Sequence, residues 1–202
     1  MLLNELKRWS FVASIVLIGT RGAVAQATKP APDATKKWTA KEICSQIEQS
    51  ARTFNLPKHF FARLIWKESR FDIKAVSPVG AQGIAQFMPA TAKARGLKDP
   101  YDPAQAIPAS ASLLAFHRGQ FGNLGLAAAA YNAGPNRVQR WLIGRSSLPF
   151  ETEDYVATIT GKLAATFRQR NARVNAPKLH KTKPFGEACA ALPIMKTRFR
   201  GI

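Results

Sequence analysis

The stretch Phe60–Ala92, FFARLIWKESRFDIKAVSPVGAQGIAQFMPATA, changes from a helical to a turn-rich pattern within one segment. One helix face is formed by four residues at the spacing i, i+3, i+4 and i+7: Phe61, Leu64, Ile65 and Glu68. Glu68 therefore stands where the pattern favours an apolar side chain. Glycines and a Ser-Pro pair follow, so we predict a turn-rich segment or a small β-hairpin near residues 77–87.

The rest of the chain continues this helical character. No stretch of any length alternates with the period of a β-strand, and no internal repeat is present. The sequence therefore predicts a mainly α domain. The helices that we expect lie at about residues 41–55, 57–71, 89–96, 109–121, 124–132, 135–142 and 153–170.

The N-terminal 25 residues have the composition of a secretory signal peptide. Lys7 and Arg8 precede the apolar run 11–19, and Ala23-Val24-Ala25 is a small-residue cleavage site. The apolar run is about half of the ~20 residues that a membrane-spanning helix needs. We therefore predict export, cleavage after Ala25 and no stable membrane insertion afterwards. Residues 26–40, rich in Ala, Pro, Thr and Lys, are predicted to be a flexible lead-in.

The chain is strongly basic, with 30 Lys and Arg against 12 Asp and Glu and a net charge of +18. Removal of residues 1–25 takes away Lys7, Arg8, Arg21 and Glu5, which leaves a mature charge of +16. Such an excess favours acidic partners but says little about the fold. The basic residues are spread over all segments and form no recognised nucleic-acid motif, so we expect no nucleic-acid partner.

The two cysteines, Cys44 and Cys189, lie near the two ends of the expected domain. An exported protein meets an oxidising compartment, where a disulfide is stable. We predict a Cys44–Cys189 disulfide; two free thiols are the alternative.

Glu68 is the acidic residue best placed for proton transfer. Apolar neighbours raise the pKa of a carboxyl group, which lets it keep its proton near neutral pH. The alternative is a surface Glu paired with one of three nearby cations: Lys67, Arg70 or Lys74. Most glycoside hydrolases use a second carboxylate. Asp72 is the nearest candidate, whereas Asp99 and Asp102 have the context of turn residues.

Other chemistries find no support in the sequence. The histidines, His59, His117 and His180, are scattered, and two distant cysteines do not make a metal site. The Gly80–Gly83 segment lacks the Gly-Lys-Ser/Thr ending of a phosphate-binding loop, and no Gly-x-Ser-x-Gly elbow is present. We expect neither a metal nor another cofactor.

Four blocks together resemble the soluble lytic transglycosylases of bacterial cell walls. They are Glu68-Ser69, the segment 77–92 (SPVGAQGIAQFMPATA), the segment 130–134 (AYNAG) with Val138, and the segment 149–156 (PFETEDYV). The resemblance covers about residues 41–170 and leaves a basic C-terminal tail, residues 171–202. It implies a lysozyme-like helical domain that acts on the MurNAc–GlcNAc β-1,4 bond of peptidoglycan.

The resemblance also implies residue roles. In that family a single Glu acts first as acid and then as base, and the C6 hydroxyl of the sugar attacks C1 to give a 1,6-anhydro-MurNAc end. Glu68 matches this acid/base residue. The positions that match the sugar cleft are Ser77, Gln86, Met88, Tyr131, Asn132, Glu151 and Tyr155. Met88 could instead fill the core, and Asn132 could only help to end its helix.

The chain departs from the family pattern in three places. Ala85 stands where the family usually has Met, which leaves the width of the cleft open. Glu153 stands where an Arg is common, and the segment between Phe150 and Glu151 is one residue short.

Two alternatives to a transglycosylase follow from these residues. The first is a hydrolytic muramidase that uses Asp72 with Glu68, and the second is a non-catalytic peptidoglycan-binding or assembly factor of a secretion apparatus. The expected partners are peptidoglycan glycan strands. Components of a wall-spanning secretion apparatus are a second class of partner that is consistent with the family resemblance. We expect a periplasmic or secreted monomer.

Overall fold

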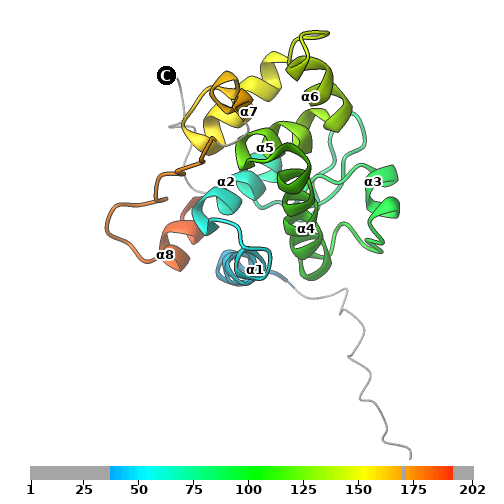
Figure 1. The fold of residues 1–202 in the computed structure, drawn as a ribbon. Helices are drawn as coiled ribbons and strands as arrows, with labels where there is room; N and C mark the ends of the chain where they lie inside the picture. The colour runs from blue at the N-terminus through cyan, green and yellow to red at the C-terminus, as the bar shows by residue number, and fades with distance from the viewer. Residues whose placement is uncertain (1–36, 170–171, 193–202) are drawn as a thin grey trace, which may run out of the picture. The chain divides into compact units, whose positions relative to one another are not determined.

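The computed structural model describes residues 37–169 and 172–192, and this part of the chain is helical (Figure 1). The helices are α1 (Ala40–Thr53), α2 (Lys58–Ser69), α3 (Pro89–Ala94), α4 (Pro103–Phe121), α5 (Leu124–Ala133), α6 (Pro135–Leu142), α7 (Phe150–Thr160), the 3₁₀ helix η1 (Ala164–Arg168) and α8 (Phe185–Ala190). Within the described residues, extended pairing is limited to isolated bridges. The prediction of a mainly α domain is confirmed.

Helix α2 is the most deeply buried part of the core. Phe60, Phe61, Leu64 and Ile65 have no exposed surface, as the apolar spacing predicts. The helix packs against α1, α7 and α8. Ala-rich α5 lies against α4, α6 and α7, and Ala127 to Ala130 are all buried. Small side chains let these helices approach closely. Helix α7 packs on both α5 and α2, and its Tyr155 reaches Glu68 in the last turn of α2.

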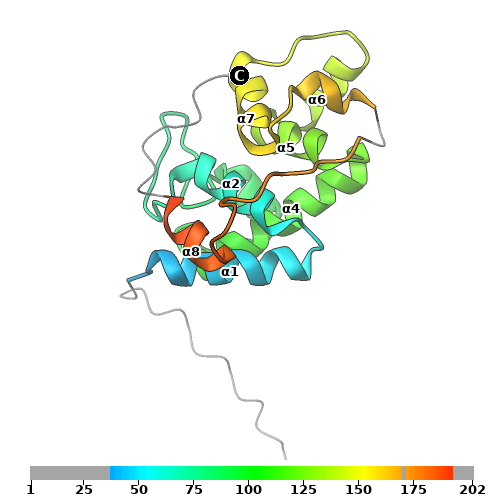
Figure 2. The ribbon, with the colours of Figure 1, turned by 90° about the vertical axis from the view of Figure 1, so that its left-hand side faces the viewer.

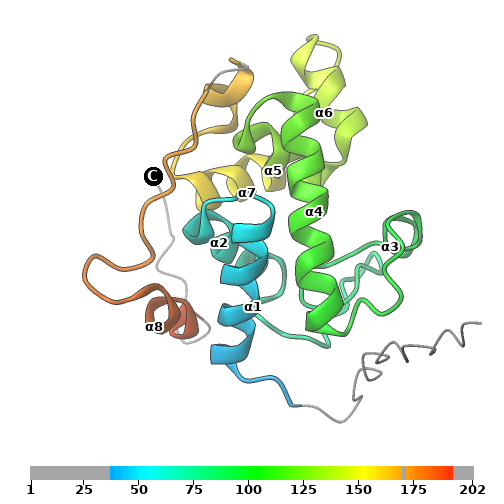
Figure 3. The ribbon, with the colours of Figure 1, turned by 60° about the horizontal axis from the view of Figure 1, so that its bottom comes forward.

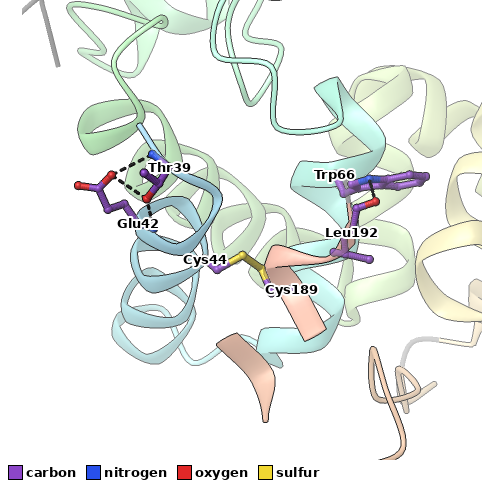
Figure 4. Close-up of a disulfide and its surroundings, with 6 residues drawn as sticks. All are labelled: Thr39, Glu42, Cys44, Trp66, Cys189 and Leu192. Carbon is purple, nitrogen blue, oxygen red and sulfur yellow. Dashed lines mark hydrogen bonds between the residues drawn. A yellow bond between two sulfur atoms is a disulfide. The ribbon is translucent and has the colours of Figure 1, made fainter. Parts of the chain in front are cut away.

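A disulfide joins the two ends of the described chain. Cys44 of α1 and Cys189 of α8 are bonded with their Cα atoms 5.9 Å apart, and both side chains are buried. Figure 4 shows this bond beside the start of α1, where Thr39 and Glu42 form a capping box. Figure 3 shows α8 beside α1. The disulfide predicted from the sequence is therefore present, and part of the predicted tail lies in the core.

Two helix boundaries differ from the sequence prediction. Helix α4 begins at Pro103 rather than near residue 109, because Asp102 caps it by accepting a hydrogen bond from the Ala104 N–H. Pro108, expected to precede the helix, lies inside it. Helix α7 was expected over residues 153–170 but ends at Thr160, since Gly161 adopts a left-handed conformation (φ 72°) that closes the helix.

The segment between α2 and α3 is turn-rich, as predicted. Isolated antiparallel bridges join Gln82 to Val76 and to Phe87. Gly83 is required here, because a Cβ atom at this position would lie 1.9 Å from the carbonyl oxygen of Pro100. The segment is thus pinned against the start of the α4 region.

No helix among the described residues is long and apolar enough to cross a bilayer. The predicted signal peptide and most of the predicted lead-in lie outside the described residues.

Two glycines in helices provide a matched test of this packing. A Cβ atom at Gly125 of α5 would lie 2.1 Å from Cγ of Phe167, whose ring is fully buried, whereas nothing lies within 4 Å at Gly119 of α4. We expect Gly125→Ala to lower the free energy of unfolding by about 1–3 kcal/mol through overpacking. Gly119→Ala should raise it by up to about 1 kcal/mol through helix propensity. Urea unfolding measures both, and equal effects of the two changes would contradict the packing of α5 against η1.

Candidate active site

Glu68 lies in the last turn of α2, where the apolar face of the helix meets α7. The Tyr155 hydroxyl of α7 donates a hydrogen bond to Glu68 Oε1. The Glu68 side chain as a whole is half-buried, but its carboxyl group is enclosed by protein. Tyr155 itself is buried, with 2% of its surface exposed. The geometry therefore places one carboxyl group at the junction of two helices.

Burial raises the pKa of the Glu68 carboxyl from 4.5 to about 8. The hydrogen bond from Tyr155 opposes this rise, the negative charge of Glu151 adds to it, and Lys67 lowers the pKa slightly. Desolvation is the largest cause, since it disfavours the charged form. Glu68 is thus protonated at neutral pH while a hydrogen-bond donor stands ready for its anion.

The alternative of a surface ion pair does not describe Glu68. Lys67 pairs instead with Asp154, with 2.6 Å between Nζ and Oδ2. The Arg70 guanidinium lies over the ring of Trp66, 5.7 Å from its centroid. In the described structure the hydrogen-bond partner of Glu68 is a phenol and not a cation.

The end of α2 is tied to the turn-rich segment through backbone carbonyls. Ser69 Oγ donates to the Ile84 carbonyl at 2.7 Å. The Tyr131 hydroxyl lies 2.8 Å from the Ala85 carbonyl oxygen and 2.9 Å from Ser110 Oγ. Because a carbonyl only accepts, the Tyr131 proton goes to Ala85, and Ser110 supplies the proton of the second bond. The carbonyls of Ile84 and Ala85 therefore tie the turn-rich segment to Ser69 of α2 and to Tyr131 of α5.

Tyr131 lies close enough to Glu68 for the negative charge of Glu68 to change the pKa of the Tyr131 hydroxyl. Burial raises the pKa of Tyr131 well above its ordinary value, and the negative charge of Glu68 raises it further. Glu68 likewise adds to the raised pKa of Tyr155. Both tyrosines that were predicted to line the cleft therefore lie near the predicted acid.

The residues of the turn-rich segment that were predicted to line the cleft have different surroundings. Ser77 closes a turn, because its Oγ accepts from the Ala81 N–H at 3.0 Å. Gln86 (φ 48°) donates its amide N–H groups to the carbonyls of Gly83 (2.8 Å) and Ala75 (3.3 Å). Met88 is 41% exposed and so does not fill the core.

The predicted residues near α7 are anchored by a threonine. Thr152 Oγ1 donates to Asn132 Oδ1 at 2.7 Å, so the Asn132 amide N–H₂ is turned away from Thr152. The C-terminal end of helix α5 is capped by a backbone group and not by the Asn132 side chain: the Gly134 N–H donates to the Ala130 carbonyl. Glu151 is exposed, yet its charge acts on Glu68. The Asn132 side chain thus links α5 to Thr152 of α7.

Asp72, the candidate second carboxylate, does not lie on the same helix as Glu68, although it follows Glu68 by four residues in the sequence. Helix α2 ends at Ser69, and Arg70 (φ 56°) and Phe71 (φ 67°) both adopt the left-handed conformation. The exposed Asp72 carboxylate accepts from the Lys74 N–H at 2.9 Å. The carboxylate whose charge reaches Glu68 is that of Glu151.

The model of the family described as "Transglycosylase SLT domain" matches residues 45–152, more than half of the chain. This chain belongs to the transglycosylase SLT-domain family. Curated relatives of this SLT-family chain include the transglycosylase of Enterobacteria phage PRD1, 35% identical over 103 residues that cover 51% of this chain and 38% of the relative. The soluble lytic murein transglycosylase of Escherichia coli K12 is 36% identical over 126 residues, which cover 52% and 20%.

Solved structures give the same assignment. An inactive Glu-to-Gln mutant of lytic transglycosylase Slt from Pseudomonas aeruginosa is similar with a TM-score of 0.53 and 32% identity, covering 66% of this chain and 24% of that one. Slt70 of Escherichia coli is similar with a TM-score of 0.51 and 29% identity, covering 62% and 24%. This SLT-family chain therefore spans less than two fifths of the length of each of these relatives.

Three residues near the candidate site were not predicted from the sequence to be site residues, although two of them, Phe150 and Thr152, lie in the block 149–156. Ser110 is fully buried on α4 and bonds to Tyr131, and buried Thr152 orients Asn132. Phe150, at the start of α7 and next to Glu151, is 85% exposed. The Ser110 hydroxyl and the exposed Phe150 ring can be assigned to the candidate site only when the residues around them in the structure are known. No group of three or more His, Cys, Asp or Glu in the described ranges is placed to hold a metal ion.

The Glu68 pKa gives a test of the site that needs no substrate. Tyr155→Phe removes the donor to the carboxylate, so the pKa of Glu68 should rise further above about 8. Glu151→Gln removes a like charge and should lower it. Because Glu151 is exposed, its effect should shrink as salt is added, and that of Tyr155 should not. NMR titration of ¹³C-labelled Glu side chains measures both, and shifts of the same sign would contradict this geometry.

Proposed function

We propose that this SLT-family chain is an exported peptidoglycan lytic transglycosylase. It cleaves the MurNAc–GlcNAc β-1,4 bond without water and leaves 1,6-anhydro-MurNAc ends. The observation that carries the proposal is the enclosed Glu68 carboxyl, which is protonated near neutral pH and bonded to Tyr155. The names of the relatives, which include soluble lytic murein transglycosylases, support the substrate.

The first step is protonation of the glycosidic oxygen by Glu68. A carboxyl group with a pKa of about 8 holds its proton at neutral pH and can release it to the leaving sugar. As the bond breaks, positive charge develops at C1 and negative charge remains on Glu68. The Tyr155 hydroxyl already donates to Oε1, so it stabilises the carboxylate as it forms.

The second step returns the proton to Glu68. The C6 hydroxyl of MurNAc attacks C1, the new C1–O6 bond closes the anhydro ring, and the hydroxyl proton passes to the Glu68 carboxylate. No second carboxylate and no water are consumed, so the enzyme is back in its starting state. The raised pKa that makes Glu68 an acid in the first step also makes its anion a competent base in the second.

The sugar is held by side chains that surround this carboxyl group. The Asn132 amide N–H₂, oriented by Thr152, is a donor for the N-acetyl carbonyl of the substrate. The Gln86 amide oxygen can accept from a sugar hydroxyl, since its N–H₂ is already used. Exposed Met88 and Phe150 offer apolar surface for sugar rings, Phe150 as a flat stacking platform.

Export is supported by the N-terminal pattern of residues 1–25 and by the disulfide. The Cys44–Cys189 bond is of the kind that persists in oxidising compartments, where peptidoglycan also lies. An oxidising compartment outside the cytoplasm is therefore consistent both with the disulfide and with peptidoglycan as the substrate.

Replacement of single carboxylates tests this function and separates it from hydrolysis. We expect Glu68→Gln to reduce anhydro-muropeptide release from sacculi at least about 100-fold, because the proton donor is lost. Asp72→Asn should leave release unchanged, since its carboxylate is engaged in its own turn. Mass spectrometry of the soluble products measures both, with circular dichroism to show that each variant is folded. Normal release by folded Glu68→Gln, or loss of release only in Asp72→Asn, would overturn the proposal.

A further inference from the structure

Residues 172–192 form a segment that we call the C-terminal strap. The strap lies outside residues 45–152, which match the SLT family model, yet it packs on α2, the helix that carries Glu68 (Figure 2). Phe185, Cys189 and Leu192 of the strap are all buried. A segment beyond the family domain thus contributes to the core around the candidate site.

Arg63 of α2 fastens the middle of the strap. Its Nη1 donates to the Pro177 carbonyl at 2.6 Å, and its Nη2 donates to the Lys178 carbonyl at 3.1 Å. Only 5% of Arg63 is exposed, and burial lowers the pKa of its guanidinium. Its recorded hydrogen bonds go to backbone carbonyls, including that of His59 at 3.3 Å. Without the strap, a buried guanidinium would lose the partners that offset its desolvation.

Two further contacts hold the strap along α2. The Leu179 N–H donates to His59 Nδ1 at 3.3 Å. The rings of His59 and Phe185 pack in a T-shaped arrangement with their centroids 5.3 Å apart. Two residues before Glu68, Trp66 Nε1 donates to the Leu192 carbonyl at 2.9 Å (Figure 4). The contacts therefore run from the first turn of α2 to its last, where the acid stands.

The disulfide makes this attachment firm. Helix α8 has six residues, which is too short to be stable alone. Its bond to Cys44 of α1 closes a loop with a sequence separation of 145, which strongly restricts the unfolded chain. Because α1 and α8 both contact α2, the disulfide joins two elements that pack on that helix.

We propose that the C-terminal strap positions α2, and with it the Glu68 carboxyl against Tyr155, through Arg63, Trp66 and the Cys44–Cys189 disulfide. These are positioning residues, since they act on the reaction through α2. The proposal rests on the proposed function of Glu68 as the acid. The disulfide then serves catalysis as well as stability.

The test uses the full exported chain and changes one fastening at a time. Arg63→Met removes the donors but keeps an unbranched apolar chain in place of the arginine stem, and Arg63→Lys restores a donor. Trp66→Phe keeps a six-membered aromatic ring and removes the part of the indole that carries the N–H, so it provides a second test if Arg63→Met does not fold. Cys44→Ala with Cys189→Ala removes the covalent bond. Arg137→Met, at an exposed position on α6, is the matched control.

The readouts are kcat and KM on soluble peptidoglycan strands, the melting temperature and the NMR pKa of Glu68. We expect Arg63→Met and the double cysteine variant to lower kcat about 10- to 100-fold with KM little changed, because a small displacement of the acid is costly. The pKa of Glu68 should fall toward its ordinary value as the carboxyl becomes hydrated, and Arg63→Lys should recover part of both effects. Trp66→Phe should give the same changes on a smaller scale, and Arg137→Met should give none.

Folded variants that melt at a lower temperature but keep the wild-type kcat and Glu68 pKa would overturn the proposal and leave the strap a purely stabilising segment. The NMR titration needs no turnover. If the wild-type chain released no muropeptides, the proposed function would fail, while a fall in the Glu68 pKa on loosening the strap would still show that it positions the carboxyl.

Discussion

The enclosure of the Glu68 carboxyl at the end of α2 is the constraint on which the rest of the site depends. Burying a carboxyl group raises its pKa, and the Tyr155 hydroxyl offers its anion a hydrogen bond without a neutralising cation. A cation in place of Tyr155 would stabilise the anion and lower the pKa, which would leave no acid at neutral pH. The ion pair of Lys67 with Asp154 keeps the nearest lysine occupied elsewhere.

Backbone groups carry much of the support for this arrangement. Tyr131 and Ser69 bond to the carbonyls of Ala85 and Ile84, so these two anchoring bonds are made to the backbone and not to side chains. The anchoring bond to residue 85 is therefore made by its carbonyl oxygen, at the position where the family resemblance led us to expect Met. Ala85 is fully buried, so the substitution changes side-chain volume beneath the segment and leaves the anchoring bond intact.

The parts of the fold that depend on local pattern could be predicted from the sequence. The apolar spacing before Glu68 gave the buried face of α2, and export together with two cysteines gave the disulfide. What could not be predicted depends on contacts distant in sequence or on unusual backbone. Left-handed Arg70 and Phe71 have no sequence signal, and they remove Asp72 from the helix. The strap is another such case, because its partners on α2 lie more than a hundred residues away.

The central claim is that one carboxyl group, acting as acid and then as base, cleaves the glycan without water. Digestion of purified sacculi in water enriched with the heavy oxygen isotope tests it most directly, with mass spectrometry of the new chain ends. The account predicts MurNAc ends that are lighter than the reducing form by one water and contain no heavy oxygen. Reducing ends that carry heavy oxygen at C1 would contradict it and would indicate hydrolysis.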